Sequence, residues 1–451
     1  MSIYIKIKKG LDIKLAGDAG KEISDLPMPG TFAIKPPDFI GITPLLLVKQ
    51  GDEIQAGTPL FCDKNNEAVL FCSPVSGEVI DILRGEKRKI LEIKILADKE
   101  ISYVDFGKSN PADLNREAII QALLNGGVWP FIRQRPLGII ANPNDTPKSI
   151  FISAFDSSPL APDYDFMLQG QGEAFQTGLT ALQKLTTGKV HLNIKAGAAA
   201  DTVFSNAKGV QLNTIAGPHP AGNVGVQIHH IDPVNKGDIV WCVNPQDVCI
   251  IGKLFLLGKL DASRIIALTG SQVMRPKYYK TLTGSSVKNI IADGGLKNGV
   301  SRVISGNVLT GQQITADGFL CFYDSQLTII PEGHEPEFMG WLKPGFDKLS
   351  MSRTFFSWLT PNKKHGVNTN LHGEERPFVI TGEYEKVFPM DIYPVQLLKS
   401  ILIEDIEMME NLGIYEVVEE DFALCEFICT SKIESQDIIR KGLDIIRKEL
   451  S

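Results

Sequence analysis

Apolar and polar positions follow three different rhythms along this chain. Over residues 1–105, short apolar runs are separated by Gly-Asp, Ala-Gly and Ser-Gly turns, a pattern typical of all-β structure. The clearest part runs from Leu45 to Phe61 and continues from Cys72 to Ile80. We predict that this part folds as a small, flattened barrel or sandwich.

From residue 127 to residue 255, continuous apolar runs alternate with stretches of helical periodicity. Such alternation predicts a parallel sheet with helices on its faces. The expected strands lie at residues 137–141, 149–154 and 190–194, and an expected helix lies at 172–184. A separate helix is expected before this region, over residues 111–124.

The remaining residues change pattern again. Residues 264–268 fit a strand, and residues 286–292 fit a helix that is followed by an apolar run over 300–309. Two helices are expected near the end, over residues 394–412 and 431–450; the second begins with the capping-box pattern Ser431 to Glu434. We therefore expect a multi-domain α/β and α+β protein, with domains at residues 1–105, 106–258, 259–328 and 329–451.

Composition limits the function classes. The chain has 451 residues, 43% hydrophobic and 22% charged, with a net charge of −7, which gives no reason to expect a nucleic-acid partner. No apolar window is long enough to span a membrane, and no signal peptide is expected at the N-terminus. The seven cysteines form no C-x-x-C pair, so we expect reduced, buried thiols and neither a metal nor an iron–sulfur site.

Three of the seven histidines, His219, His229 and His230, fall in the Gly- and Pro-rich stretch 217–234. We interpret it as a shaped loop that leads into a strand over residues 226–231. On a strand, His229 and His230 would point to opposite faces and could not line one pocket. These imidazoles suit hydrogen bonds to loop carbonyls or proton transfer near neutral pH. A metal site would need further ligands that the sequence does not nominate.

An aromatic segment contains Phe355, Phe356 and Trp358, and Lys363, Lys364 and His365 follow it. Packing into a C-terminal domain is the common fate of such aromatic residues. The alternative is a docking patch, with the basic residues meeting anionic lipid headgroups.

No catalytic residue can be assigned from motifs. The nearest nucleotide-binding fingerprint, Gly170-Gln-Gly172, has Phe175 where a third glycine is required, so we expect no bound nucleotide. No nucleophile–base pair stands out either.

Several stretches carry family resemblances. The run from Val48 to Ile80 resembles the barrel-sandwich hybrid of biotinyl and lipoyl carriers, although Lys64 lacks the context of a modified lysine. Residues 217–234 resemble the HPAG-x-VG-x-x-IH-x-x-DPV signature found in the A subunits of the Na+-translocating NADH:quinone reductase. Residues 5–13, 26–30, 266–276 and 382–392 are also similar to this family.

The resemblance implies an N-terminal barrel-sandwich hybrid, a Rossmann-like α/β domain, a β-grasp domain of the soluble-ligand-binding type and a mostly helical C-terminal domain. It also implies a translocase of six subunits that reduces ubiquinone or menaquinone and exports Na+. NADH, flavins and an iron–sulfur centre would bind to other subunits. This chain would carry no covalent cofactor and no active site of its own, and would lie on the cytoplasmic side of the bacterial inner membrane beside five partners, integral membrane subunits among them.

Within that resemblance, six residues become candidates for contact with quinone or with a neighbouring polypeptide of the complex: His219, His229, His230, Phe355, Phe356 and Trp358. Two functions stay open: a subunit that helps to form or gate the quinone site, or a scaffold with quinone bound wholly elsewhere. A free-standing NADH-dependent flavoprotein is a lesser third possibility.

Overall fold

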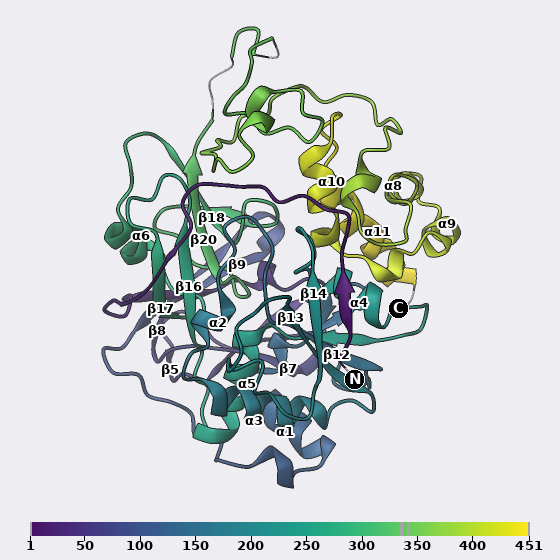
Figure 1. Cartoon of the computed structure of the whole chain (residues 1–451). Coiled ribbons are helices and arrows are strands. Elements are labelled where there is room, and N and C mark those ends of the chain that lie inside the picture. The colour runs from purple at the N-terminus through teal and green to yellow at the C-terminus, as the bar shows by residue number, and fades with distance from the viewer. Residues whose placement is uncertain (1, 334–336, 341, 450–451) are drawn as a thin grey trace.

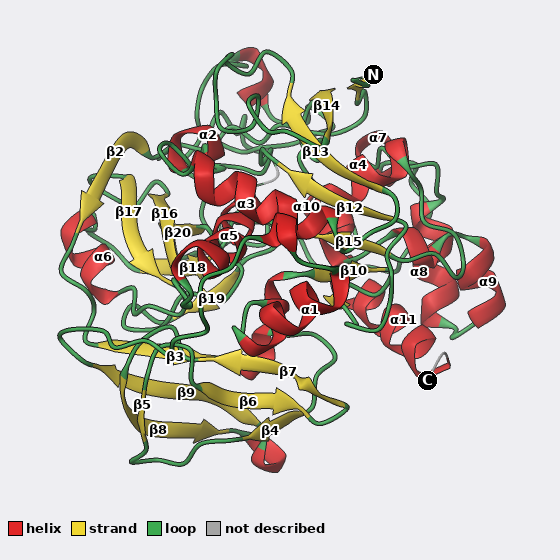
Figure 2. Cartoon of the chain, turned by 90° about the horizontal axis from the view of Figure 1, so that it is seen from below, coloured by secondary structure: helices red, strands yellow, loops and turns green. Residues whose placement is uncertain are grey.

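The computed structural model describes residues 2–333, 337–340 and 342–449. Four β-sheets and a C-terminal group of helices make up this part of the chain (Figure 1, Figure 2). None of the helices among these residues is long and apolar enough to cross a membrane.

Two small sheets form the predicted N-terminal sandwich, which Figure 2 shows beside the rest of the molecule. Its core does not stop at the sandwich, because Phe39 packs on Phe71 and on Phe322 with ring centroids 4.4 and 4.7 Å apart. One sheet has the order β3 (Thr31–Ile34), β9 (Ile90–Ala97), β8 (Gly77–Arg84) and β5 (Glu53–Ile54); the other has β4 (Pro44–Leu46), β6 (Pro59–Asp63) and β7 (Asn66–Cys72).

A seven-stranded sheet forms the centre of the molecule. Five of its strands run parallel, as predicted, but β10 pairs antiparallel with both β15 and β11. Its order is β1 (Tyr4–Lys6), β14 (Gln211–Ala216), β13 (Lys189–Lys195), β12 (Ser149–Ser153), β15 (Val240–Cys242), β10 (Arg133–Arg135) and β11 (Ile139–Ile140). The helices of this part are α1 (Arg116–Asn125), α2 (Tyr164–Met167), α3 (Gly172–Gln183), α4 (Val224–Ile231) and α5 (Pro245–Leu257).

Helices α3 and α5 touch backbone to backbone. A Cβ added at Gly178 would lie 2.1 Å from the Val248 carbonyl oxygen, and one added at Gly252 would lie 1.8 Å from that of Ala174. Only glycine permits this approach at both positions.

A six-stranded mixed sheet lies next along the chain, with α6 (Lys288–Gly294) packed on it. The strand predicted over residues 264–268 is β16, and the predicted helix over 286–292 is α6. The order of this sheet is β19 (Gln312–Ile314), β18 (Ser301–Ser305), β20 (Gln326–Pro331), β16 (Ser263–Thr269), β17 (Lys277–Leu282) and β2 (Gly20–Asp25).

The first 25 residues connect these sheets. Strand β1 pairs parallel with β14 of the seven-stranded sheet, and β2 pairs parallel with β17 of the mixed sheet. The N-terminal stretch therefore ties the two larger sheets together before the chain enters the sandwich.

The C-terminal helices are α7 (Tyr384–Val387), α8 (Pro394–Leu402), α9 (Ile406–Asn411), α10 (Ala423–Ile428) and α11 (Ser435–Glu449). The single helix predicted over 394–412 is wrong, because Asp405 accepts a hydrogen bond from the Met408 N–H and caps a new helix there. Helix α11 begins after the predicted capping box, since the Ser431 hydroxyl donates to the Pro377 carbonyl instead. Leu450, the predicted end, lies outside the described residues.

The strand predicted over residues 226–231 is also wrong: residues 224–231 form helix α4. Val224, Ile228 and Ile231 have the i, i+4, i+7 spacing of a helix face, and they pack together against Phe151 and Val240 of the sheet. Packing has overridden the β-propensity of valine and isoleucine at these positions.

Candidate functional site

A cleft of about 450 Å³ opens where the seven-stranded sheet, the mixed sheet and the C-terminal helices meet. One wall is the carboxyl edge of the seven-stranded sheet, where β12 ends at Ser153 and β15 ends at Cys242. The chain leaves β12 toward β13 on one side and returns to β15 on the other. Open α/β sheets bind ligands at such a switch point. This cleft is therefore the candidate functional site.

His219 lies in the wall of this cleft. Its backbone N–H donates to Asp12 Oδ1 at 2.9 Å, and its Nδ1 lies 3.0 Å from the Ser157 hydroxyl, which itself accepts from the Gly222 N–H. Burial lowers the pKa of His219, so the ring is neutral near pH 7. A fixed, neutral imidazole beside a polar cleft can donate or accept a hydrogen bond there.

His229 points elsewhere. The Asp391 N–H donates to Nε2 at 3.0 Å, so Nδ1 carries the ring proton, which it donates to Glu416 Oε2 at 2.7 Å. Both nitrogens are thereby used to hold α4 against the C-terminal helices. His229 is not among the residues that line the cleft.

His230 is the third predicted candidate, and it also lies away from the cleft. Its Nδ1 lies 2.9 Å from the Val226 carbonyl oxygen, one turn earlier in α4, and donates to it. Burial lowers the pKa of His230. The structure therefore brings only His219 of the three histidines to the candidate site.

Two arginines on β10 were not predicted as site residues, and both line the cleft. Arg135 is buried and donates to Asp421 Oδ2 at 2.8 Å and to Glu420 Oε1 at 2.6 Å. Gly225 in α4 leaves room for this cluster, since a Cβ there would lie 2.5 Å from the guanidinium. The sequence signal that could have identified them is the presence of two arginines at alternate positions of one strand in the apolar interior.

Arg133 is held differently. Its guanidinium carbon lies 5.0 Å from the centre of the Tyr323 ring, in a cation–π contact. Within residues 2–333, 337–340 and 342–449, no carboxylate lies within ion-pair distance of this guanidinium. Arg133 therefore brings to the cleft a positive charge without an ion-pair partner, although it still acts on the buried Asp247, whose pKa is raised by burial and lowered in part by Arg133.

The acidic residues of the cleft are mostly compensated. Asp38 lies 3.7 Å from the Lys35 ammonium, and burial raises its pKa to about 6. Asp324 accepts from the Ser305 hydroxyl, and burial raises its pKa as well. Glu419 and Glu420 pair with Arg440 and Arg135. The cleft is thus less acidic than its composition implies.

The three aromatic candidates do not line this cleft but lie in the segment between β20 and α7. The described residues of that segment, which we call the connecting segment, are 332, 333, 337–340 and 342–383. Phe356 and Trp358 belong to a short 3-10 helix, Phe356–Leu359, and are 48% and 46% exposed. Phe355 is half-buried and has the Lys348 ammonium 5.4 Å from its ring centre. The prediction that these residues pack into a C-terminal domain does not describe Phe356 or Trp358.

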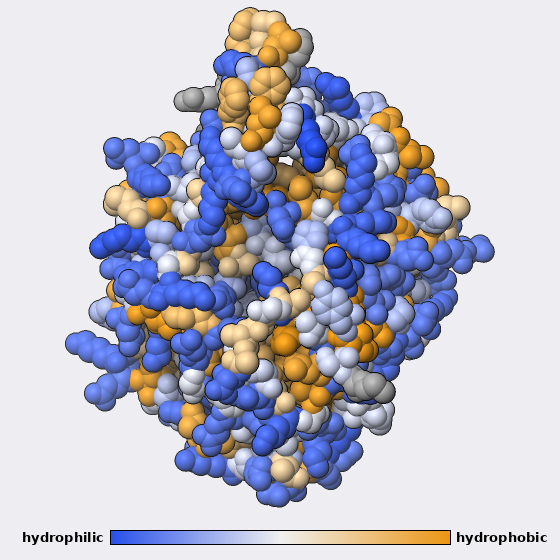
Figure 3. Space-filling model, viewed as in Figure 1, coloured by the Kyte–Doolittle hydropathy of each residue, from blue (hydrophilic) through white to orange (hydrophobic). Residues whose placement is uncertain are grey.

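The connecting segment protrudes at the top of Figure 1, and apolar residues gather on it in Figure 3. Of the three basic residues expected beside the aromatic segment, Lys363 and Lys364 are exposed and pair with Asp347 and Asp18, and His365 is buried. The exposed apolar residues, which we call the apolar surface, are Phe338, Met339, Leu342, Phe346, Phe356, Trp358, Leu359, Leu371, Val379 and Ile380.

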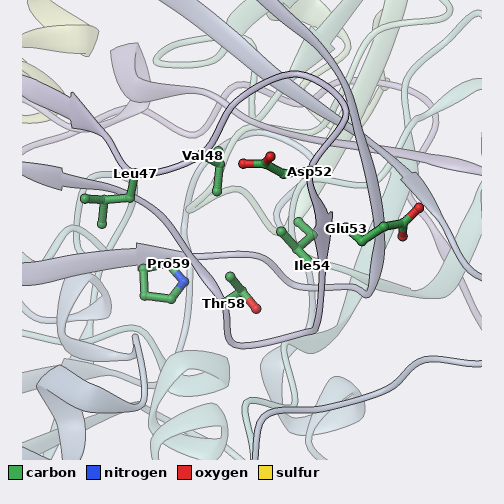
Figure 4. Close-up of a pocket in the computed structure, with 7 residues that line it drawn as sticks. All are labelled: Leu47, Val48, Asp52, Glu53, Ile54, Thr58 and Pro59. Atoms are coloured by element: carbon green, nitrogen blue, oxygen red, sulfur yellow. The ribbon is translucent and has the colours of Figure 1, made fainter.

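A second depression, of about 440 Å³, lies on the N-terminal sandwich (Figure 4). The carboxylates of Asp52 and Glu53 point in different directions there, and Asp52 accepts from the Lys49 N–H within its own turn. Lys64, the position that matches a carrier lysine, is not among the lining residues. No set of polar groups converges in this depression.

Three described domain families match successive parts of the sequence. Residues 5–98 match the NqrA N-terminal barrel-sandwich hybrid domain, residues 114–260 the NqrA second alpha/beta domain, and residues 265–316 the NQRA C-terminal domain. These matches define a protein of the NqrA class and confirm the predicted barrel-sandwich hybrid and α/β domain. The Rossmann-like character and the domain limits stay predictions.

Full-length relatives specify the family. The chain is 40% identical over 450 residues to the A subunit of the Na(+)-translocating NADH-quinone reductase of Rhodopirellula baltica, covering 98% of each chain. It is 41% identical over 448 residues to that of Yersinia pestis bv. Antiqua and 38% identical over 447 residues to that of Marinomonas sp.. The chain belongs to the family of A subunits of the Na(+)-translocating NADH-quinone reductase, which the sequence resemblance predicted.

Proposed function

We propose that this chain is the peripheral A subunit of a Na+-translocating NADH:quinone reductase of six subunits, on the cytoplasmic side of the inner membrane. The observation that carries the proposal is the full-length similarity to relatives of that name. In this role the chain contributes to the reduction of ubiquinone or menaquinone, while NADH, flavins and the iron–sulfur centre belong to its partners.

The cleft is the place we propose for contact with the quinone head group. Quinone reduction needs hydrogen bonds and protons at two carbonyl oxygens, and a neutral imidazole in the cleft wall is suited to exchange one of them. His219 lies in the cleft wall with its Nδ1 fixed by Ser157. His229 and His230 contribute indirectly, since α4 connects the cleft to the C-terminal helices.

The apolar surface is the place we propose for docking to integral membrane subunits. Phe356 and Trp358 each leave nearly half of their area in water, and the nearby lysines are neutralised by local carboxylates. Exposed apolar patches of this kind mark interaction sites. An apolar protein surface matches this chemistry better than anionic lipid headgroups do.

The test is detergent extraction of host membranes that carry a tagged copy, followed by pull-down and assay. We expect integral membrane partners and Na+-stimulated NADH:quinone reductase activity in the eluate. Recovery of the chain alone, yellow with bound flavin, would contradict the proposal in favour of a free-standing flavoprotein.

The second candidate is a pure scaffold that orders the membrane subunits, with quinone bound wholly elsewhere. The extensive apolar surface is compatible with it. The two functions separate in an assembled complex that carries His219→Gln, because a scaffold does not need an imidazole in the cleft.

A further inference from the structure

We infer that Arg133 holds the quinone oxygen on which negative charge develops during reduction. This inference depends on the proposed function of the cleft and adds a second residue to it. Its basis is a guanidinium in the cleft wall that has no ion-pair partner among the described residues, whereas the neighbouring Arg135 is paired with two carboxylates.

Both the backbone and the guanidinium of Arg133 are held in place. On β10, Arg133 lies opposite Cys242 of β15 and opposite Ile140 of β11, so its backbone is inside the sheet. Its guanidinium rests over the Tyr323 ring at 5.0 Å, and the Tyr323 hydroxyl donates to the Pro130 carbonyl at 2.7 Å. The charge is therefore held at a defined place in the wall of the cleft.

The neighbouring arginine cannot play this part. Arg135 is already paired with two carboxylates, and moving it would leave the buried Asp421 without its cation. Burial removes the hydration of a cation, so a guanidinium without an ion-pair partner at the edge of a core is energetically unfavourable. An anionic or strongly polarised oxygen in the cleft would compensate it.

The overall reaction converts NADH, H⁺ and quinone into NAD⁺ and quinol, with both electrons supplied from NADH through the partner subunits. Two C=O groups become two C–OH groups, so negative charge builds on an oxygen before its proton arrives. Guanidinium N–H groups form strong, charge-assisted hydrogen bonds to such an oxygen. Donors fixed in advance stabilise this charge far more than they stabilise the neutral carbonyl.

Because Arg133 and His219 have different roles, the loss of each should change the kinetics in a different way. Arg133 stabilises charge, so its loss should lower kcat for quinone more than it raises KM. His219 exchanges a proton or hydrogen bond, so its loss should also change the pH profile of the quinone reaction. Neither residue should matter for electron transfer from NADH to a water-soluble one-electron acceptor such as ferricyanide.

The experiment compares assembled complexes that carry Arg133→Gln, Arg133→Lys and the control Arg84→Gln, which lies on the N-terminal sandwich. Rates are measured with a short-chain quinone and with ferricyanide. We expect Arg133→Gln to lower kcat for quinone by roughly ten- to a hundredfold, Arg133→Lys to lower it less, and Arg84→Gln to leave it unchanged. Ferricyanide rates should be unchanged in all three.

Unchanged quinone kinetics in Arg133→Gln would overturn the inference, and so would an equal loss with ferricyanide. If Arg133→Gln prevents assembly, Arg133→Lys decides: wild-type kcat for quinone in that variant overturns it. A parallel His219→Gln complex separates the two claims. Loss in His219→Gln with none in Arg133→Gln removes only the role of Arg133, whereas wild-type rates in both remove the proposed function of the cleft.

Discussion

The cleft and the connecting segment differ in which groups they leave without partners. In the cleft, apolar side chains are buried and most charged groups have an ion-pair partner, while Arg133 is a cation that has none among the described residues. In the connecting segment, the lysines are paired while large apolar side chains face water; Phe338 is 87% exposed. The first region is suited to a small polar ligand, and the second to a large apolar partner. One chain thus separates ligand contact from docking.

The largest loss of stability at the cleft is expected when Arg135 is removed. Arg135→Ala leaves Asp421 and Glu420 without their cation, and we expect the free energy of unfolding to fall by about 3–5 kcal/mol. Urea unfolding of the isolated chain measures this. The exposed Arg353→Ala should change it by less than about 0.5 kcal/mol, and equal stabilities of the two variants would refute the description of Arg135 as a buried clamp.

A smaller effect is expected where α4 meets the C-terminal helices. His229→Phe removes the partners of Glu416 and of the Asp391 N–H, at a cost of about 1–2 kcal/mol in the free energy of unfolding. His230→Phe is the matched control, since only one intrahelical hydrogen bond is lost there. If His230→Phe is the more destabilising change, the assignment of His229 to the contact between these parts is wrong.

In the connecting segment we expect substitutions to weaken partner binding while leaving the stability of the chain almost unchanged. Replacing both Phe356 and Trp358 by serine should leave the stability of the isolated chain within about 0.5 kcal/mol. Recovery with membrane partners should fall about tenfold, which corresponds to about 1.4 kcal/mol of binding. Val300→Ser, at an exposed apolar position next to β18 of the mixed sheet, is the control. Normal recovery of the double variant would exclude these residues from docking.

The last effect concerns acid. Burial lowers the pKa of His191 to about 4, whereas an exposed histidine titrates near 6.5. Between these values the unfolded chain binds a proton that the folded chain does not, so the free energy of unfolding falls as pH falls and is unaffected above pH 6.5. His191→Gln should make this dependence shallower by at most one proton, about 1.4 kcal/mol per pH unit. Parallel curves for the two proteins from pH 7 to 5 would contradict it.

Local patterns predicted the regular parts of the fold well. The turns of the sandwich and the helix at 172–184 follow from Gly-rich dipeptides and from periodicity over a few residues. The pairing of β1 with β14 and of β2 with β17 left no local signal, because each joins residues far apart in sequence. Helix α4 was missed because Val224, Val226 and Ile228 alternate as in a strand, and only packing decides between the two periods.

The candidate site was harder to predict than the fold. His219 was found because histidines between prolines stand out in a sequence. Arg133 was missed because its partner, Tyr323, is distant in sequence and lies in the turn before β20 of the mixed sheet. The exposure of Phe356 and Trp358 was also unpredictable, since the same residues suit a core or an interface until the surrounding packing is known.

The most direct test of the account is the quinone reductase rate of an assembled complex that carries His219→Gln. We predict at least a roughly tenfold lower rate with quinone, with all partners retained and the NADH:ferricyanide rate unchanged. A wild-type rate with quinone in that complex would contradict the role of His219, and a wild-type rate in the Arg133→Gln complex as well would leave the chain as a scaffold.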